Sequence, residues 1–328
     1  MITRRHLATG LAALTATGLT ATVGPAAAQA PWPSRPVRFI VPWPPGGLND
    51  LVARAFNDPV SRALGQPIVN DFRAGAGGRI GVAEVARAAP DGYTIGMGNL
   101  GPLTIFPHLF RDIPYDASRD LASIVMFAAA PLVLVVSNDV PARNVAEFIA
   151  WAKARPGRGN YASVGIGTAQ HLIFEMFRGR DGIAMEHVPF RGTNESLPAM
   201  LRGDVQAMFD TLPLMRAPVE AGQVRALAVT TPMRVPQLPN VPTLQEQGYD
   251  IDVATWYGVI APAATPAPIL QRLHSEYVRV AESPEGQQFL AAQGLIYLPN
   301  APGAFAARAA AERARWGQII AAQGIKVE

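Results

Sequence analysis

The 328-residue sequence predicts an α/β protein made of two doubly wound domains, each built on a mainly parallel sheet. Strand-like and helix-like segments alternate from residue 36 to about residue 98, and the alternation returns from residue 161. One helix between two successive strands gives a right-handed crossover and therefore parallel strands. The length agrees with two domains, since a single core seldom serves more than about 250–300 residues.

The first half begins with an apolar, β-branched run that is typical of a strand, followed by apolar residues at helical spacing. Several prolines and glycines at 99–120 predict irregular structure there. The elements expected in this half are strand 36–41, helix 51–60, strand 68–71, helix 82–86 and strand 93–97.

Two apolar strands, 123–127 and 132–136, are separated by Pro131 and are expected to lead from one domain into the other. A helix follows Asn144, whose spacing to Glu147 is that of a capping box. The remaining elements are expected in this order: strand 161–164, a helix through 174–177, strand 187–190, helix 195–201, strands 207–210 and 226–229, a strand at 256–260 that returns to the first domain, and helices 266–281, 285–292 and 303–322.

Residues 1–28 are typical of an export signal. Arg4 and Arg5 form a basic region, a weakly apolar stretch follows, and Ala26-Ala27-Ala28 offers a cleavage site of small residues. The paired arginines fit the twin-arginine route, but such pairs also occur in ordinary leaders. No later segment reaches the ~18–20 apolar residues that span a bilayer, so we expect a soluble, exported protein.

Charge and composition exclude several classes of function. The net charge of +3 becomes 3 − 2 = +1 without the two leader arginines, which is too small for a nucleic-acid-binding surface. The chain has no cysteine, and motifs of serine hydrolases, zinc peptidases and dinucleotide-binding proteins are missing. His171 and Glu175 share a helix face, but no third metal ligand is evident. We therefore expect no catalytic group, no metal site and no cofactor.

The turn after the first strand is the strongest candidate for a ligand site. Pro42 and Pro44 stiffen it, and Gly46-Gly47 precedes the helix. A helix N-terminus carries unpaired N–H groups and partial positive charge, and glycines let a ligand approach the backbone. The turn suits a carboxylate or a phosphate. The alternative is an ordinary corner in which Asn49 or Asp50 caps the helix.

Small, polar turns also follow other strands in both halves. Because ligands collect at the carboxyl ends of parallel strands, two such sets of turns would face each other across a cleft. The candidates for ligand binding outside the first turn are Gly77, Gly78, Asn99, Ser163, Gly167, Thr168, His171, Arg191 and Asp210.

Three of the candidates carry a structural interpretation beside the functional one. We favour a capping and orienting role for Asp50, because its carboxylate would repel an acidic ligand. Thr168 can cap its helix or donate its hydroxyl to the ligand. His171, one turn further along that helix, fits a structural role as well as a functional one.

The charged and aromatic candidates also have two interpretations each. Arg191 is the only strong cation expected in the cleft, yet most arginines are simply solvated. Asp210 ends an apolar strand, where it either bonds turn N–H groups or receives an ammonium group from the ligand. Trp43 either walls the pocket or packs under the proline turn.

Several motifs follow one another in a recognisable order. Those of the first half are Pro42-x-Pro44-x-Gly46-Gly47-x-x-Asp50-x-x-Ala53-Arg54, Arg73-Ala-Gly75-Ala-Gly77-Gly78 and Pro90-Asp91-Gly92-Tyr93-Thr94. Those of the second half are Gly167-Thr168-x-x-His171, Pro189-Phe190-Arg191-Gly192, Gly203-Asp204-Val205-x-x-Met208-Phe209-Asp210 and Pro239-x-Val241-Pro242-Thr243. Together they resemble the tripartite tricarboxylate transporter receptors, the Bug-type periplasmic solute-binding proteins, over essentially the whole mature chain.

The resemblance implies a periplasmic binding protein of type II architecture, with a cleft and hinge strands between its domains. We assign residues 31–130 and 255–328 to domain 1 and residues 131–254 to domain 2. The resemblance also implies that backbone groups and ordered water of the first turn, Trp43 and Pro44 included, hold a ligand carboxylate, with the Gly167-Thr168 turn contributing. Trp43 and the apolar run at 99–103 depart from the family pattern, which shifts the expected ligand from a tricarboxylate toward a monocarboxylate, an aromatic acid or an amino acid.

We therefore predict a monomeric periplasmic receptor that presents a small carboxylate to the membrane permease subunits of a tripartite tricarboxylate transporter. One alternative is an exported enzyme that uses His171 and Asp210 as an acid–base pair. Another is a sensor that docks on a membrane partner. Release of intact ligand favours the receptor, and turnover favours the enzyme.

Overall fold

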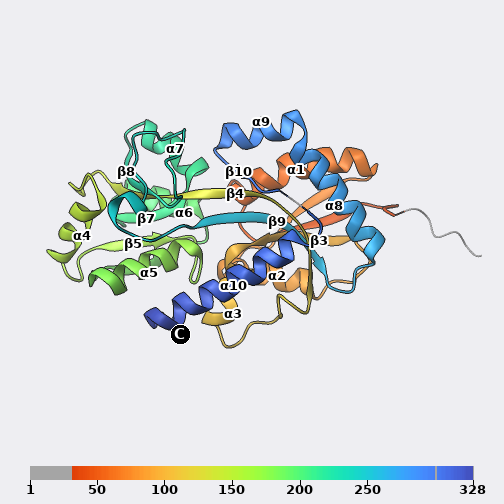
Figure 1. Ribbon diagram of the computed structural model, residues 1–328, viewed down its shortest axis with the longest axis horizontal. Coiled ribbons are helices and arrows are strands. Elements are labelled where there is room, and N and C mark those ends of the chain that lie inside the picture. Colours follow the sequence, from red (N-terminus) through yellow and green to blue (C-terminus); the bar gives the residue numbers. More distant parts are fainter. Residues whose placement is uncertain (1–31, 300, 328) are drawn as a thin grey trace, which may run out of the picture. The chain divides into compact units, whose positions relative to one another are not determined.

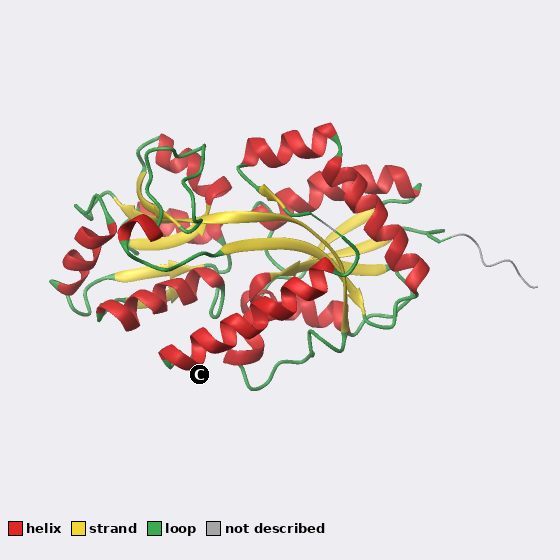
Figure 2. Ribbon diagram, in the orientation of Figure 1, coloured by secondary structure: helices red, strands yellow, loops and turns green. Residues whose placement is uncertain are grey.

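The structure is a computed structural model that describes residues 32–299 and 301–327. A mixed ten-stranded sheet runs through it, with helices packed on the sheet (Figures 1 and 2). The expected export signal lies outside the described residues. The strands are β1 (Val37–Val41), β2 (Ile68–Phe72), β3 (Thr94–Asn99), β4 (Leu121–Ser137), β5 (Asn160–Ser163), β6 (Glu186–Pro189), β7 (Ala207–Thr211), β8 (Val224–Val229), β9 (Ala254–Pro262) and β10 (Ile296–Tyr297).

Most of the expected helices are present close to their predicted positions. They are α1 (Leu48–Leu64), α2 (Arg79–Ala86), α3 (Phe106–Leu109), α4 (Val145–Lys153), α5 (Ala169–Asp181), α6 (Thr193–Leu201), α7 (Leu212–Glu220), α8 (Ala267–Glu282), α9 (Pro284–Gln293) and α10 (Ala304–Gln323). The segment expected to be irregular holds a π-helical turn, Gly101–Ile105, and the short α3. Helix α7 is not among the helices that the sequence predicts, because Pro218 interrupts its helical pattern, whereas Pro213 stands at the helix start, where proline is tolerated.

The sheet has two parallel halves with two long strands between them. Eight strands follow the order β2-β1-β3-β9-β4-β7-β5-β6, and β8 and β10 each pair with β4. Strand β1 pairs in parallel with β2 and β3, and β5 pairs in parallel with β6 and β7, so each half is doubly wound as predicted. Strands β4 and β9 run antiparallel to each other and connect the halves (Figure 1). The fold is the two-domain α/β architecture that the sequence predicted.

Strand β4 corrects one expectation, because the two predicted strands around Pro131 are one continuous strand, Leu121–Ser137. Pro131 stands opposite Ala254, at the last pair between β4 and β9. Beyond this point β4 pairs with β7 and β8 instead. A proline lacks an N–H donor, and a change of partners is a place where a strand tolerates that loss.

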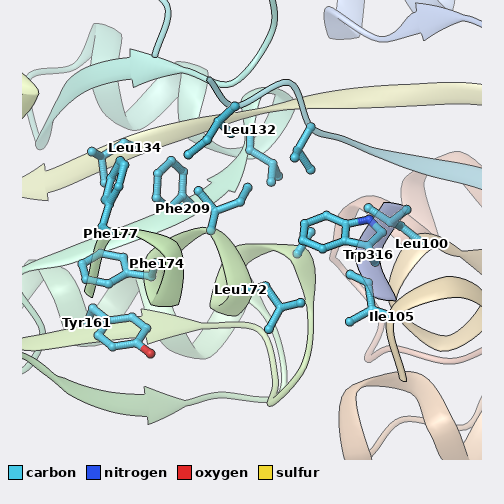
Figure 3. Close-up of a cluster of buried hydrophobic side chains, with 14 of the residues drawn as sticks. Leu100, Ile105, Leu132, Leu134, Tyr161, Leu172, Phe174, Phe177, Phe209 and Trp316 are labelled. Carbon is cyan, nitrogen blue, oxygen red and sulfur yellow. The ribbon is translucent and has the colours of Figure 1, made fainter. Parts of the chain in front are cut away.

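Stacked aromatic side chains hold the helices α1 and α5 against the sheet. In the second half, Tyr161 and Phe174 stack with ring centroids 3.9 Å apart, and Phe177 and Phe209 pack beside them (Figure 3). In the first half, Phe56 of α1 stacks on Phe127 of β4 at 4.2 Å. These contacts anchor α1 and α5 on the sheet, so their N-termini are held in defined positions.

Candidate functional site

A cavity of about 100 Å³ lies where the strand ends of the two halves meet. The first half supplies Trp43, Pro44, Gly47–Asn49 and Asn99–Pro102, the second half supplies Val164, Thr168–Gln170, Gly192–Glu195, Asp210, Thr211 and Leu214, and β9 supplies Thr255 and Tyr257. Both halves therefore contribute to one site, at the carboxyl ends of the parallel strands, where ligands of α/β folds collect.

The predicted ligand residues fall into three groups. Those on the wall of this cavity are Trp43, Pro44, Gly47, Asn99, Thr168 and Asp210. Gly77, Gly78 and Arg191 line a second cavity beside it, which Trp43 also lines. Gly46, Asp50, Ser163, Gly167 and His171 line neither of the two and lie behind the walls.

Four helices, α1, α5, α6 and α7, begin at the wall of the first cavity. Their N-cap residues are Gly47, Thr168, Gly192 and Thr211; the glycines have no side chain, and neither threonine hydroxyl accepts a bond from its own helix within the described chain. Away from the cavity, Asn144 and Ser283 cap α4 and α9, while α2, α8 and α10 also begin without a side-chain cap. N–H groups at uncapped N-termini are free to bind a ligand, and the helix dipole makes those ends favourable for an anion.

The turn before α1 is held by Asp50, in the orienting role we favoured. The N-cap is Gly47 rather than Asn49 or Asp50, because Asp50 is the third residue of the helix. Its Oδ2 accepts a hydrogen bond from Gly46 N at 2.9 Å, and its Oδ1 pairs with Arg54 Nε at 2.5 Å. The carboxylate is therefore occupied within the turn, and the backbone at 47–49 is left to line the cavity.

The turn before α5 is held in a similar way by its own side chains. Thr168 Oγ1 donates to Gly165 O at 2.8 Å, so its proton is used within the turn and the hydroxyl does not cap the helix. Gly167 N donates to His171 Nδ1 at 3.1 Å. His171 thus acts on the turn from behind and positions the backbone that lines the cavity.

His171 belongs to a buried polar cluster behind the site. Its ring stacks on that of His187 at 4.0 Å, and His187 Nε2 lies 2.7 Å from Ser163 Oγ. Tyr161 bonds to Glu175, whose carboxylate also pairs with Arg178 at 2.9 Å. Burial lowers the pKa of His171 to about 4 and that of His187 to about 3, and the charge of Arg178 acts in the same direction. Both rings are therefore neutral near pH 7.

These two histidines predict an acid sensitivity of the fold. Each has a folded-state pKa below the unfolded value near 6.5, so the unfolded chain binds more protons and stability is lost as the pH falls from about 6.5 toward 4. We expect His187→Gln to reduce this loss, measured as the free energy of urea unfolding at pH 7.5 and pH 4.5. An equal loss in the variant and in wild type would contradict the assignment. His274→Gln, in α8 and away from this cluster, serves as the control.

Asp210 is the buried carboxylate of the cavity, with 1% of its surface exposed. It accepts hydrogen bonds from Thr211 N at 2.6 Å and from Thr193 Oγ1 at 2.8 Å. Burial raises its pKa to about 6, against the effect of these hydrogen bonds. Asp210 thus does bond a turn N–H, the first of its two interpretations, while its place on the cavity wall keeps the ligand interpretation open. His171 does not share this cavity, so the geometry offers no His171–Asp210 acid–base pair.

Further polar atoms on the wall are buried and without a partner. Asn99 Nδ2 donates to Trp256 O at 3.1 Å, while its Oδ1 finds no hydrogen bond among the residues that the structure describes. Asn49 Oδ1 and Thr255 Oγ1 likewise have no hydrogen-bond partner among these residues. Buried polar atoms are nearly always satisfied, and three of the ten unpaired ones in the described chain lie around this cavity, where a ligand or water would satisfy them.

Sequence reasoning missed part of the wall. The polar wall residues that the sequence did not suggest as ligand contacts are Asn49, Gln170, Thr193, Asn194, Glu195, Thr211, Thr255 and Tyr257. Thr255 and Tyr257 flank Trp256 in β9, and residues two apart in a strand face the same side. Two residues with hydroxyl groups at alternate positions of an otherwise apolar strand are the sequence pattern that indicates this polar wall.

The described residues include neither a membrane-spanning helix nor a cluster of metal ligands. None of the helices in residues 32–299 and 301–327 combines the length and the apolar character that crossing a membrane requires. Over the same residues, no cluster of three or more His, Asp and Glu side chains has the arrangement that would hold a metal ion.

Comparison with known proteins agrees with this geometry. Residues 52–325 match the model of the tripartite tricarboxylate transporter family receptor. The protein BugT of Bordetella pertussis is 34% identical over 299 residues, 90% of this chain and 92% of BugT. The structure of a Rhodopseudomonas palustris protein with adipate has a TM-score of 0.86 at 32% identity, over 90% of this chain and 99% of the other. MatC from Rhodopseudomonas palustris with bound malate has a TM-score of 0.83 at 29% identity, over 88% and 99% of the two chains. The chain therefore belongs to the tripartite tricarboxylate transporter receptor family.

Proposed function

We propose that this protein is a periplasmic receptor that captures a small carboxylate between its two halves for the permease subunits of a tripartite tricarboxylate-type transporter. One observation carries the proposal. Four uncapped helix N-termini meet at one cavity, and within the described residues no Lys, Arg or His side chain lines it. Such a site binds an anion through backbone N–H groups and neutral donors.

The strength of such a site comes from several small terms. Each helix N-terminus favours an anion by roughly 0.3–1 kcal/mol, and hydrogen bonds from uncharged donors to a charged group contribute about 1.5–3 kcal/mol each. A carboxylate has two oxygens and accepts several such bonds. The relatives with malate and adipate bind carboxylates, which favours a carboxylate over the phosphate that the turn alone also suits.

The position of the cavity between the two halves also supports a closing motion. Its wall comes from both halves, so a ligand contacts both and favours the closed arrangement. Strands β4 and β9 separate at Pro131 and Ala254, next to the boundaries that we assign at 130/131 and 254/255. The two domains are proposed to hinge there.

Closure predicts a measurable change of size. Small-angle scattering of the mature protein should give a smaller radius of gyration at saturating ligand than without ligand. Two domains that hinge about a pair of strands compact when the cleft shuts. An identical radius in both samples would show that the cleft is rigid and would remove the hinge from the proposal.

The direct test is to identify the ligand that the protein carries. Freshly purified protein is denatured, and the released small molecules are identified by mass spectrometry, with Gly47→Val purified in parallel as a control that should release none. We expect an intact carboxylate from wild type only. Steady conversion of that compound by the protein would support the exported enzyme instead. A sensor would release the same ligand but bind a membrane partner other than permease subunits, which co-purification from membranes distinguishes.

A further inference from the structure

A second cavity of about 200 Å³ lies beside the ligand cavity, and the two share Trp43 and Val164. The second cavity is lined by the turn before α2, at 75–79, by residues 164–166 and by residues 189–191. These segments come from both halves. A Cβ added to Gly165 would lie 3.0 Å from Gly77 Cα, so the two halves touch here through glycines.

The two cavities differ in charge. Asp210 and Glu195 line the first, and no basic side chain of the described chain joins them. Arg79 and Arg191 line the second, where the described residues add no acidic side chain. In the first cavity both carboxylates already accept hydrogen bonds from the protein. A molecule long enough to reach both cavities would therefore meet helix N-termini beside these carboxylates at one end and two cationic side chains at the other.

The guanidinium groups of both arginines are available to bind an anion. Arg79 lies over the Phe110 ring at 3.7 Å, and its Nε donates to Ala76 O at 3.3 Å. Arg191 bonds Glu195 only through its backbone N–H, at 3.1 Å. Neither guanidinium forms an ion pair within the described part of the chain, whereas Arg38, Arg54 and Arg178 do. Unpaired guanidinium groups beside a cavity fit a carboxylate, which arginine binds with two parallel hydrogen bonds.

Trp43 is the wall between these cavities. Its side chain is largely buried, with 9% of its surface exposed, and Pro42 and Pro44 restrict the backbone on either side. The indole ring lies against Gly78, where an added Cβ would come within 2.7 Å of the ring. Its Nε1–H makes no hydrogen bond to a described residue and is free for a ligand.

We propose that Trp43 sets the length of the ligand that this receptor accepts, by closing the ligand cavity off from a second, cationic cavity formed by Arg79 and Arg191. The inference rests on the proposed function, because it takes the first cavity to be the carboxylate site. A short acid fits on the near side of the indole. When the indole is replaced by a small side chain, the cavities join, and the far carboxylate of a longer dicarboxylate binds Arg79 and Arg191.

The test measures affinity by calorimetry for the linear dicarboxylates from succinate to suberate. Four mature proteins are compared: wild type, Trp43→Ala, Trp43→Phe as the control that keeps a ring, and Trp43→Ala combined with Arg79→Gln and Arg191→Gln. We expect Trp43→Ala to raise the affinity for suberate relative to succinate by at least about tenfold, a factor that calorimetry resolves easily. We expect Trp43→Phe to keep the wild-type order and the triple variant to lose the gain.

Each other outcome overturns a stated part of the inference. An unchanged order of affinities in Trp43→Ala means that Trp43 does not set ligand length. A gain that survives in the triple variant means that the second cavity is not a carboxylate subsite. Binding of none of these acids by wild type or by any variant overturns the proposed carboxylate site itself. Trp43→Leu replaces the alanine variant if circular dichroism shows that the latter does not fold.

Discussion

Gly47→Val is expected to weaken carboxylate binding by at least about 100-fold, close to 3 kcal/mol, while the protein stays folded. Gly47 is the N-cap of α1 and lines the ligand cavity. Its backbone has φ −87° and ψ 178°, an extended conformation that any residue adopts. An added Cβ would meet only Pro44 O, at 3.8 Å. The valine side chain therefore enters open space beside the N–H groups that we propose to bind the ligand, and meets little else.

Backbone strain plays no part in this expected loss of binding. The positive φ in the turn belongs to Gly46, at 83°, and not to Gly47. Gly47→Val thus carries no backbone strain, and its effect on binding is separate from any effect on folding. Calorimetry measures the first and the melting temperature by circular dichroism measures the second, with Gly47→Ala as a smaller step of the same kind. If Gly47→Val binds as wild type does, the turn is only a corner, and the site must be sought at the N-terminus of α5 and at Arg191.

Asp210→Asn should change affinity in a direction that reveals the class of ligand. If the ligand carries an ammonium group against Asp210, removal of the negative charge should weaken binding by roughly 1.5–3 kcal/mol. If the ligand is a plain acid, the loss of a like charge should leave the affinity equal or higher. Calorimetry with an amino acid and with the matching acid lacking the amino group decides between the two. Loss of folding in the variant would instead assign Asp210 a structural role.

The raised pKa of Asp210 gives the same variant a pH signature. The folded-state value of about 6 lies above the usual 3.8, so the folded protein binds more protons between these values, and stability falls as the pH rises through them. The asparagine side chain of the variant would not titrate, because an amide carries no such proton. We therefore expect Asp210→Asn to gain stability relative to wild type between pH 4 and pH 8, measured by urea unfolding. A constant difference over this range would contradict the raised pKa.

Much of the fold followed from local patterns in the sequence. The alternation of strands and helices predicted both parallel halves, and the Asn144 cap predicted the start of α4. The failures have a common physical origin. The sequence predicts a break at Pro131, but its missing N–H falls where β4 changes partners, which only the tertiary structure reveals. Likewise, α7 contains Pro218 in its interior, and its neighbours stabilise it despite this unfavourable residue.

The site was predictable to the extent that it lies in turns after strands. The prolines and glycines around Gly46-Gly47 indicate a turn in the sequence itself. The roles of Thr168 and His171 were not decidable from sequence, because a hydroxyl or an imidazole beside a helix start can face either the ligand or its own turn. Here both side chains bond to the turn. Arg79 went unnoticed, since nothing local indicates that its turn lies beside Arg191 in the fold.

Asn194 at the start of α6 makes one more contact of consequence. Its Nδ2 donates to Pro45 O at 2.9 Å, so a side chain of the second half bonds the proline turn of the first half beside the ligand cavity. In the hinge motion proposed above, opening of the cleft breaks this bond. We therefore expect Asn194 to lengthen the residence time of the ligand, because a bond that links the halves directly slows dissociation while a ligand still reaches the open form freely. In the proposed receptor role, this one amide would be the contact through which a membrane partner triggers release.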